Sequence, residues 1–136
     1  MLTGAEAEAV LKLMDAFNRR DREAAMALLS PDVVFHPVSA RAMGRTEPFV
    51  GQAGMREYLE ITESQWEELH VEVVQIEQAG NAVTVIGRAR GRAGGGALDT
   101  TAIWTWKLRD GLICEGRVHA DTARTRTALG LDPPDG

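Results

Sequence analysis

The stretch "LDTTAIWTWKLRDGLICEGRVHA", residues 98–120, decides the fold. Two runs within it alternate apolar and polar residues, as half-buried strands do, and Asp110-Gly111 joins them. Asp-Gly between two alternating runs is the strongest short-range signal for a tight β-hairpin. The sequence therefore predicts two antiparallel strands, over residues 98–109 and 112–120.

Two upstream runs show the same alternation: "LHVEVVQIEQ" at 69–78 and "AVTVIGRARGR" at 82–92. Short connections rich in glycine separate the runs, which is typical of a meander. Four long strands in this order predict an antiparallel sheet, and strongly twisted long strands make such a sheet curl.

The first half of the chain has helical periodicity. A capping box that starts at Thr3 predicts a helix over 4–18, and Asp21 is placed to cap a second, shorter helix. A short apolar strand is predicted at 33–37, and a third helix begins at Gly51. Together with the meander, these elements predict an α+β domain covering residues 1–136. In it, a curved antiparallel meander sheet wraps around three helices and forms a cone with a hydrophobic pocket.

Residues 38–50 show no clean period, and a connection of this length is often a lid or binding loop. We expect Met43 and Phe49 to exclude water from the pocket as part of this lid.

The alternation also assigns the faces of the strands. On 82–92 it predicts that the arginines form an ion-pair ladder on the outer face of the sheet: Arg88, Arg90 and Arg92. On the last strand it places every second residue on the core side: Leu112, Cys114, Gly116, Val118 and Ala120. His119 and Asp121 then face outward, and Asp121 is expected to cap a final helix.

Composition excludes several classes of protein. The chain has 136 residues, 44% of them hydrophobic, with a net charge of −5 and one cysteine. The negative net charge argues against binding to nucleic acid or to an anionic membrane surface. No apolar run approaches the length needed to span a membrane. The acidic N-terminus is not a signal peptide, and a single cysteine fits the reducing cytoplasm.

The stretch "DVVFHPV", residues 32–38, supplies the candidate for chemistry. His36 ends an apolar strand, and Pro37 cannot continue the hydrogen-bonded ladder. An imidazole takes or gives a proton near neutral pH, so His36 at the pocket rim would be a candidate catalytic residue. The alternative is a core histidine that satisfies a backbone carbonyl.

The pocket itself is predicted from aromatic and apolar side chains that the helical and strand periods direct inward. We expect these residues to bind a ligand: Met14, Phe17, Met55, Tyr58, Trp66, Trp104, Trp106 and Val118. Aromatic walls suit a flat apolar ligand. The three histidines have no spacing typical of metal ligands, so we predict no metal and no other cofactor.

The order of elements resembles the nuclear-transport-factor-2-like superfamily, and within it the SnoaL-like group. The segments that carry the resemblance are "AFNRRDREAAMALLSPDVVFHP", "FVGQAGMREYL" and "WKLRDGLICEGRVHADTARTRTALGL". It implies the cone fold, a small hydrophobic ligand of steroid, polyketide or terpenoid type, and a homodimer formed through the sheet face.

The resemblance also allows a check of catalytic positions. Ketosteroid isomerases place a carboxylate base where this sequence has His36, and a protonated acid where it has Trp104. Epoxide hydrolases and SnoaL-type cyclases use an aspartate on the last strand, where this sequence has Val118. The chain thus departs from the known catalytic sets of the superfamily.

Two interpretations stay open. In the first, the protein is a cofactor-free isomerase, cyclase or dehydratase that moves a proton through His36, with Trp104 or Tyr58 stabilising negative charge. In the second, it is a non-catalytic ligand-binding or dimerisation module, and His36 is structural.

Overall fold

A computed structural model describes residues 4–37 and 47–131. The helices are α1 (Ala5–Arg19), α2 (Arg22–Met26), α3 (Gly51–Gln65) and α4 (Ala123–Ala128). The strands are β1 (Leu29–His36), β2 (Phe49–Val50), β3 (Glu68–Ala79), β4 (Ala82–Ala93), β5 (Gly96–Arg109) and β6 (Leu112–Ala120).

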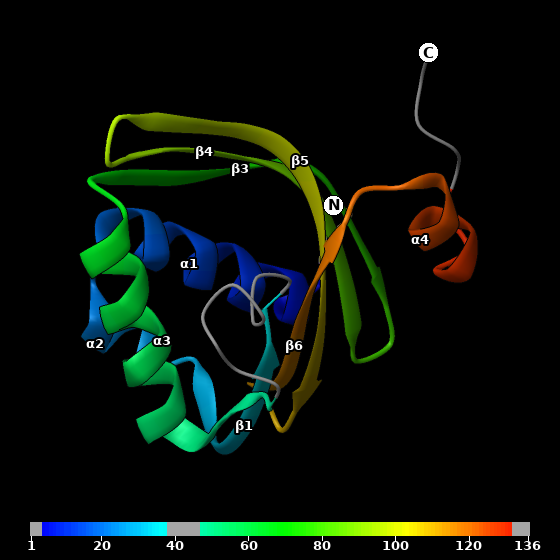
Figure 1. The fold of residues 1–136 in the computed structure, drawn as a ribbon. Helices are drawn as coiled ribbons and strands as arrows, with labels where there is room; N and C mark the ends of the chain where they lie inside the picture. Colours follow the sequence, from blue (N-terminus) through cyan, green and yellow to red (C-terminus); the bar gives the residue numbers. More distant parts are fainter. Residues whose placement is uncertain (1–3, 38–46, 132–136) are drawn as a thin grey trace.

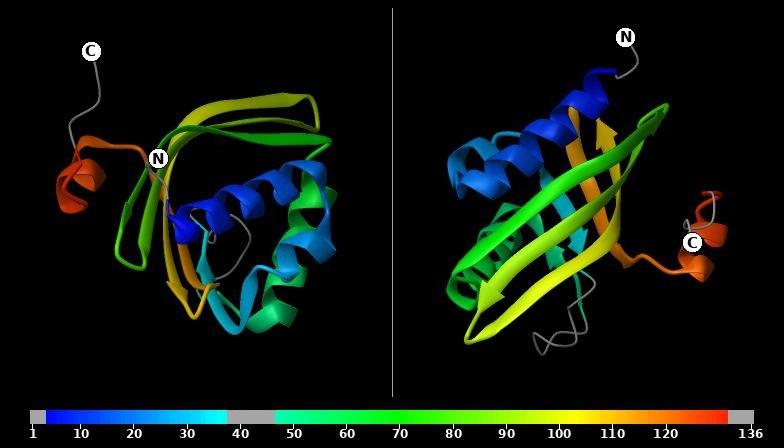
Figure 2. Two further views of the ribbon diagram at one scale, coloured as in Figure 1. Left: turned by 180° about the vertical axis from the view of Figure 1, so that it is seen from behind. Right: turned by 90° about the horizontal axis from the view of Figure 1, so that it is seen from above.

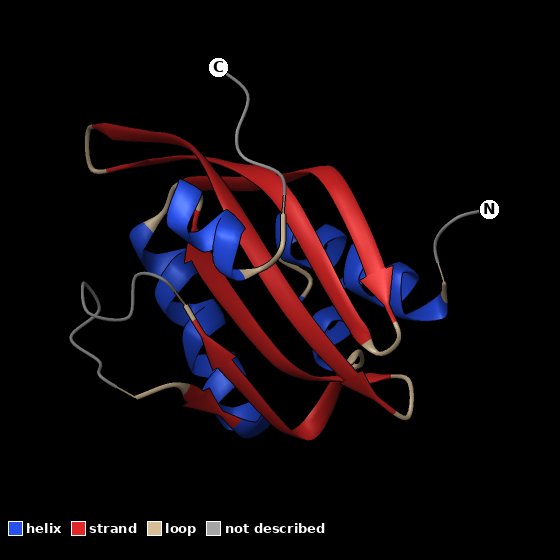
Figure 3. Ribbon diagram, turned by 90° about the vertical axis from the view of Figure 1, so that its right-hand side faces the viewer, coloured by secondary structure: helices blue, strands red, loops and turns tan. Residues whose placement is uncertain are grey.

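The strands form one six-stranded sheet in the order β2-β1-β6-β5-β4-β3. Strands β3 to β6 pair antiparallel along the chain, which confirms the predicted meander. The sheet curls around α1, α2 and α3, so that these helices lie within its concave face (Figure 1). Figure 3 looks onto the outer face of the sheet, with the same helices behind it. The predicted α+β architecture is therefore confirmed.

The pairing of β1 was not predicted. Strand β1 lies parallel to β6, with Phe35 opposite Gly116, and carries the two-residue β2 on its other edge. It begins at Leu29, four residues before the predicted start, because the chain re-enters the sheet directly after α2. The N-terminal strand thereby joins the last strand of the meander and extends the wall of the cone.

The β5–β6 hairpin turns as the sequence predicts. Asp110 and Gly111 have φ angles of 53° and 81°, the left-handed conformation at both central positions that the tightest hairpin turn requires. Asparagine and aspartate tolerate this region better than most residues, and glycine adopts it without steric cost.

The start of α1 is capped from a distant strand. Gln78 Oε1, on β3, accepts hydrogen bonds from the backbone N–H groups of Gly4 and Ala7, both at 3.1 Å. Gly4 is the N-cap and has no side chain to do this itself. The predicted capping residue, Thr3, lies outside the described residues. Gln78 satisfies donors that a helix start otherwise leaves unpaired and thereby fixes α1 to the sheet.

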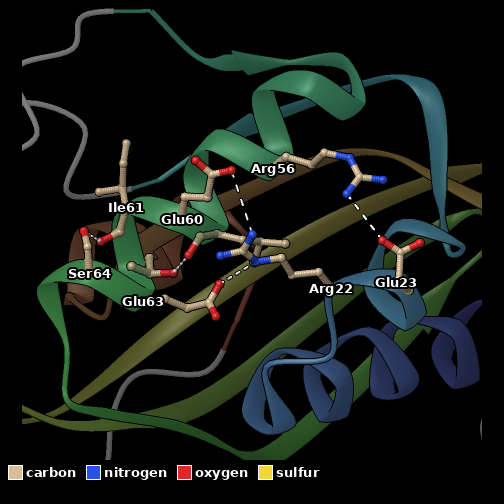
Figure 4. A network of polar contacts seen from close by, with 9 residues as sticks. Arg22, Glu23, Arg56, Glu60, Ile61, Glu63 and Ser64 are labelled. Atoms are coloured by element: carbon tan, nitrogen blue, oxygen red, sulfur yellow. Dashed lines mark hydrogen bonds and ion pairs between the residues drawn. The ribbon is translucent and has the colours of Figure 1, made fainter.

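Ion pairs hold α2 against α3 (Figure 4). The Arg22 guanidinium contacts Glu63 at 2.7 Å and Glu60 at 3.8 Å, and Arg56 contacts Glu23 at 3.4 Å. Each pair joins the short helix to the long one across their exposed side.

A β-bulge changes the predicted faces of β6. The register slips between Lys107 and Leu108, so that Leu108 pairs with Ile113 while Lys107 pairs with Glu115. Ile113 is fully buried in the core, whereas Cys114 is only partly buried and donates its thiol hydrogen to the Lys107 carbonyl at 3.4 Å. The predicted core-facing position of Cys114 is therefore wrong, because a bulge shifts the alternation by one residue. From Gly116 onward the predicted faces hold.

Helix α4 stands away from the other helices, on the outer side of the sheet (Figure 2). Its N-cap is Thr122, whose hydroxyl accepts from the backbone N–H of Thr125 at 3.1 Å, so the prediction that Asp121 caps this helix is wrong. The Asp121 carboxylate instead accepts two hydrogen bonds from Arg126, at 2.6 and 2.9 Å. With 5% and 14% of their side chains exposed, this pair attaches α4 to the end of β6.

The predicted lid lies mostly outside the described residues, Met43 included. Its other named residue, Phe49, is fully buried in β2 and contacts the Tyr58 ring with centroids 5.4 Å apart. Phe49 is therefore part of the core and not a mobile cover. No helix among the described residues is long and apolar enough to cross a membrane.

Candidate functional site

A cavity of about 410 Å³ lies between the concave face of the sheet and helices α1 and α3. Strand β5 contributes alternate residues to its wall, from Leu98 near the exposed end of the strand to Trp106 at the buried end. Since successive residues of a strand point to opposite faces, this alternation follows directly from the extended backbone. A volume of this size lies within the range of small-molecule pockets.

The structure brings the predicted pocket residues together. Every one of them lines the cavity: Met14, Phe17, Met55, Tyr58, Trp66, Trp104, Trp106 and Val118. Their role in binding a ligand stays a prediction. Sequence reasoning did not name other lining residues of β4 and β5, among them Ala89, Leu98, Thr100 and Ala102. The signal for the last three was present, since they share the β5 alternation with Trp104.

His36 does not line the cavity. Its neighbours Phe35 and Pro37 do, so the imidazole between them points to the outer face of β1. There it pairs in register with Arg117 of β6, and Glu115 lies nearby. The expectation that the imidazole and the indoles share one void is wrong, because inward Phe35 requires outward His36.

The outer position also decides the charge of the imidazole. Burial and the Arg117 guanidinium lower the pKa of His36, and Glu115 opposes them in part. On the same face, His119 Nε2 lies 3.1 Å from the Thr105 hydroxyl, and burial followed by Arg117 lowers its pKa as well. Both imidazoles are therefore neutral near pH 7, and the outward face predicted for His119 agrees with this contact.

An aromatic row closes the inner end of the cavity. The Phe35 ring packs between Tyr58, with centroids 4.7 Å apart, and Trp106, with centroids 6.0 Å apart and planes 17° from parallel. Such offset and tilted pairs are favourable beyond the area that they bury. The row is built from β1, α3 and β5, so it fixes three elements relative to one another.

Tyr58 presents the titratable group of this site. Burial raises the pKa of Tyr58 to about 12, and no hydrogen bond joins its hydroxyl to another described residue. The side chain is partly accessible and lines the cavity. Its O–H is therefore a donor that stays protonated at neutral pH.

The indole N–H of Trp106, unlike the hydroxyl of Tyr58, has almost no accessible surface. Its Nε1 is the one buried side-chain nitrogen or oxygen without a hydrogen-bond partner in the described part of the chain. An unpaired buried donor costs about 1–3 kcal/mol. Because the atom has almost no accessible surface, packing and not hydrogen bonding determines where the indole lies.

The remaining polar groups of the wall are few. The Thr62 hydroxyl donates to the Leu59 carbonyl of its own helix at 2.9 Å, and Gln65 and Thr100 lie toward the exposed end. Among the described lining residues there is no aspartate, glutamate, histidine, lysine or arginine. Nor do the described residues contain a group of three or more potential metal ligands close enough to hold an ion. The described part of the cavity wall is thus mostly apolar and carries no charge.

The sequence matches a known protein family. The family model described as the SnoaL-like domain matches residues 10–116. A search of curated protein sequences found no match.

Solved structures share the fold at low identity. An NTF2-like protein of unknown function from Burkholderia pseudomallei is 20% identical with a TM-score of 0.80, over 92% of this chain and 97% of that chain. TerC, co-crystallised with polyporic acid, is 21% identical with a TM-score of 0.77, over 94% and 98%. A putative SnoaL-like polyketide cyclase from Shewanella denitrificans is 16% identical with a TM-score of 0.71, over 86% and 90%. Because the family model spans most of the sequence and the cone recurs in these structures, the chain belongs to the SnoaL-like domain family.

Proposed function

We propose that this protein binds a small, neutral, hydrophobic molecule in the cavity of the cone. The observation that carries the proposal is the cavity of about 410 Å³, whose described lining residues include aromatic rings but no charged side chain. Burial of apolar ligand surface against such a wall supplies the binding free energy, at roughly 25 cal/mol per Å² removed from water.

The uncharged wall selects against ions. A carboxylate or ammonium group taken into this cavity would lose its hydration and find no opposite charge among the described lining residues. The effective penalty for an unpaired buried ion is several kcal/mol. A neutral ligand avoids this penalty and is therefore favoured over a charged molecule of the same shape.

The Tyr58 hydroxyl favours a ligand that carries a hydrogen-bond acceptor. It is a protonated donor without a partner among the described residues, so a ligand oxygen that accepts its hydrogen bond is favoured. A ketone, ether or ester oxygen meets this requirement. Steroids, polyketides and terpenoids are hydrophobic molecules that carry such oxygens. The similarity to a putative SnoaL-like polyketide cyclase agrees with a ligand of polyketide type.

Binding, and not catalysis, is the function that the cavity supports. A proton-transfer reaction needs a base at the ligand, and Tyr58, with a pKa of about 12, keeps its proton at neutral pH. His36, the proposed base, faces outward beside Arg117. An isomerase, cyclase or dehydratase acting through His36 would require the imidazole to reach the cavity.

The test compares two nearly isosteric probes, 2-acetylanthracene and anthracene-2-carboxylate, by titration of their fluorescence with the protein. We expect the neutral ketone to bind at least about 100-fold more tightly than the anion, which corresponds to a penalty of several kcal/mol. Equal affinity for the two probes would contradict the proposal.

A matched pair of variants locates the site. Ala89 lines the cavity, whereas Arg90, the next residue of β4, is exposed on the other face. Ala89→Phe should abolish binding of 2-acetylanthracene by filling the cavity, and Arg90→Phe should leave it unchanged. Binding that survives Ala89→Phe would place the ligand elsewhere.

A further inference from the structure

Each tryptophan of the cavity wall lies against a glycine. A methyl group built on Gly116 would lie 2.5 Å from Trp106 Cζ3 and 2.7 Å from its Cε3. One built on Gly87 would lie 3.0 Å from Trp104 Cζ3, and one on Gly91 would lie 2.9 Å from Trp66 Cε3. Optimal contacts between carbon atoms are about 3.5–4.0 Å. The indoles therefore occupy space that a side chain at the glycine would fill.

The pair formed by Gly116 and Trp106 differs from the other two. The atoms nearest to a methyl group on Gly116 all belong to side chains, namely those of Trp106 and Phe35. At Gly87 and Gly91 the nearest atom is a backbone carbonyl oxygen, at 2.5 and 2.9 Å. Substitution there would disturb the β3–β4 ladder, whereas substitution of Gly116 would act first on the aromatic rings.

The Trp106 indole is free to respond to such a change. It is the direct cross-strand partner of Gly116, and no hydrogen bond to a described residue holds its Nε1. Its position follows from contact with Gly116 below and from the stacked Phe35 ring beside it. A side chain at position 116 would push the indole away from the sheet, and the cavity lies on that side.

We infer that Gly116 is a specificity-determining residue: by leaving room for the Trp106 indole against β6, it sets the size of the largest ligand that the cavity accepts. The inference rests on the proposed function, since it concerns ligands of the same cavity. It assigns a role in selection to a residue that touches no ligand itself. Gly116→Ala should narrow the inner end of the cavity, and Trp106→Phe should widen it.

The experiment measures the ratio of dissociation constants for a large and a small neutral ketone, 1-acetylpyrene and 2-acetonaphthone. Gly116→Ala should raise this ratio about 10-fold, the lower end of what a steric mismatch of one methyl group is worth in a fitted pocket. Trp106→Phe should lower it, and the double variant should return it toward the wild-type value. Gly96→Ala is the matched control, because a methyl group on Gly96 would make only an ordinary contact, at 3.6 Å.

An unchanged ratio in Gly116→Ala, with the protein folded by circular dichroism, would overturn the inference. If Gly116→Ala does not fold, the ratio in Trp106→Phe decides: a lower ratio supports the inference and an unchanged one refutes it. Failure of the proposed function has a different signature, because the wild-type protein would then bind neither ketone.

Discussion

Alkaline titration of Tyr58 probes the environment of the cavity directly. Tyr58 is the single tyrosine of the chain, so the phenolate absorbance at 295 nm reports on this residue alone. In the unfolded chain its pKa is about 10, and burial raises the pKa of Tyr58 to about 12 in the folded protein. Between these values the unfolded state loses its proton while the folded state keeps it.

The raised pKa of Tyr58 makes the folded protein less stable as the pH rises above 10. The contribution of Tyr58 is fully present below pH 10 and is lost as pH rises through 12, because the unfolded state binds fewer protons in this range. A full pKa unit is worth about 1.4 kcal/mol, but the unfolded state is half titrated at pH 10 and the folded state at pH 12. The free energy of unfolding should therefore fall by about 2 kcal/mol between pH 10 and pH 12. Guanidinium unfolding at pH 9, 10, 11 and 12 measures this fall.

Tyr58→Phe is the control, since it removes the hydroxyl and keeps the ring that packs on Phe35. The variant keeps every other titratable group of the chain. The difference in slope between the two proteins therefore isolates Tyr58. A phenolate midpoint near pH 10, in protein that circular dichroism shows to be folded, would refute the buried position of the hydroxyl.

Three further predictions concern the outer face and α4. His36→Ala should change the affinity for 2-acetylanthracene less than about 2-fold in fluorescence titration, since the imidazole faces outward, and a loss above about 10-fold would place it at the ligand. Asp121→Asn should speed hydrogen exchange of the α4 amides, because it removes charge from the pair with Arg126. Arg126 lowers the pKa of Asp121, so acidification below about pH 4 should have the same effect, and unchanged exchange in both cases would contradict the role of the pair. Arg88→Ala should leave the thermal midpoint nearly unchanged despite the 2.6 Å contact with Asp99, because both side chains are about half exposed, and a large drop would refute this.

Local signals in the sequence predicted the local structure. The Asp110-Gly111 turn and the alternation of β5 followed from backbone conformation, and the predicted ladder of arginines appears as contacts such as Arg92 with Glu68 at 3.2 Å. Cys114 was misplaced because a bulge adds one residue without any local sequence mark.

The site shows where the same reasoning fails. The position of His36 in the resemblance suggests an imidazole at the pocket, but strand alternation with an inward Phe35 directs the imidazole outward. The contact between Gly116 and Trp106 could not be predicted, since it depends on the exact register of two strands. Gln78 capping α1 depends on contacts across more than half of the chain, which no local pattern encodes.

The parallel pairing of β1 with β6 has a consequence for biosynthesis. Asp32, on β1, and Arg109, at the end of β5, are 77 positions apart and meet through hydrogen bonds of 2.7 and 2.9 Å. At about 5–20 residues per second, the ribosome needs roughly 4–15 s to translate the intervening segment. During this delay one edge of β1 has no strand beside it. The indole side chains of β5 leave the ribosome before β6 can pair with β1 and complete the wall of the cone. A nascent chain interrupted before residue 112 would therefore be a target for chaperones and proteases, and not a smaller folded protein.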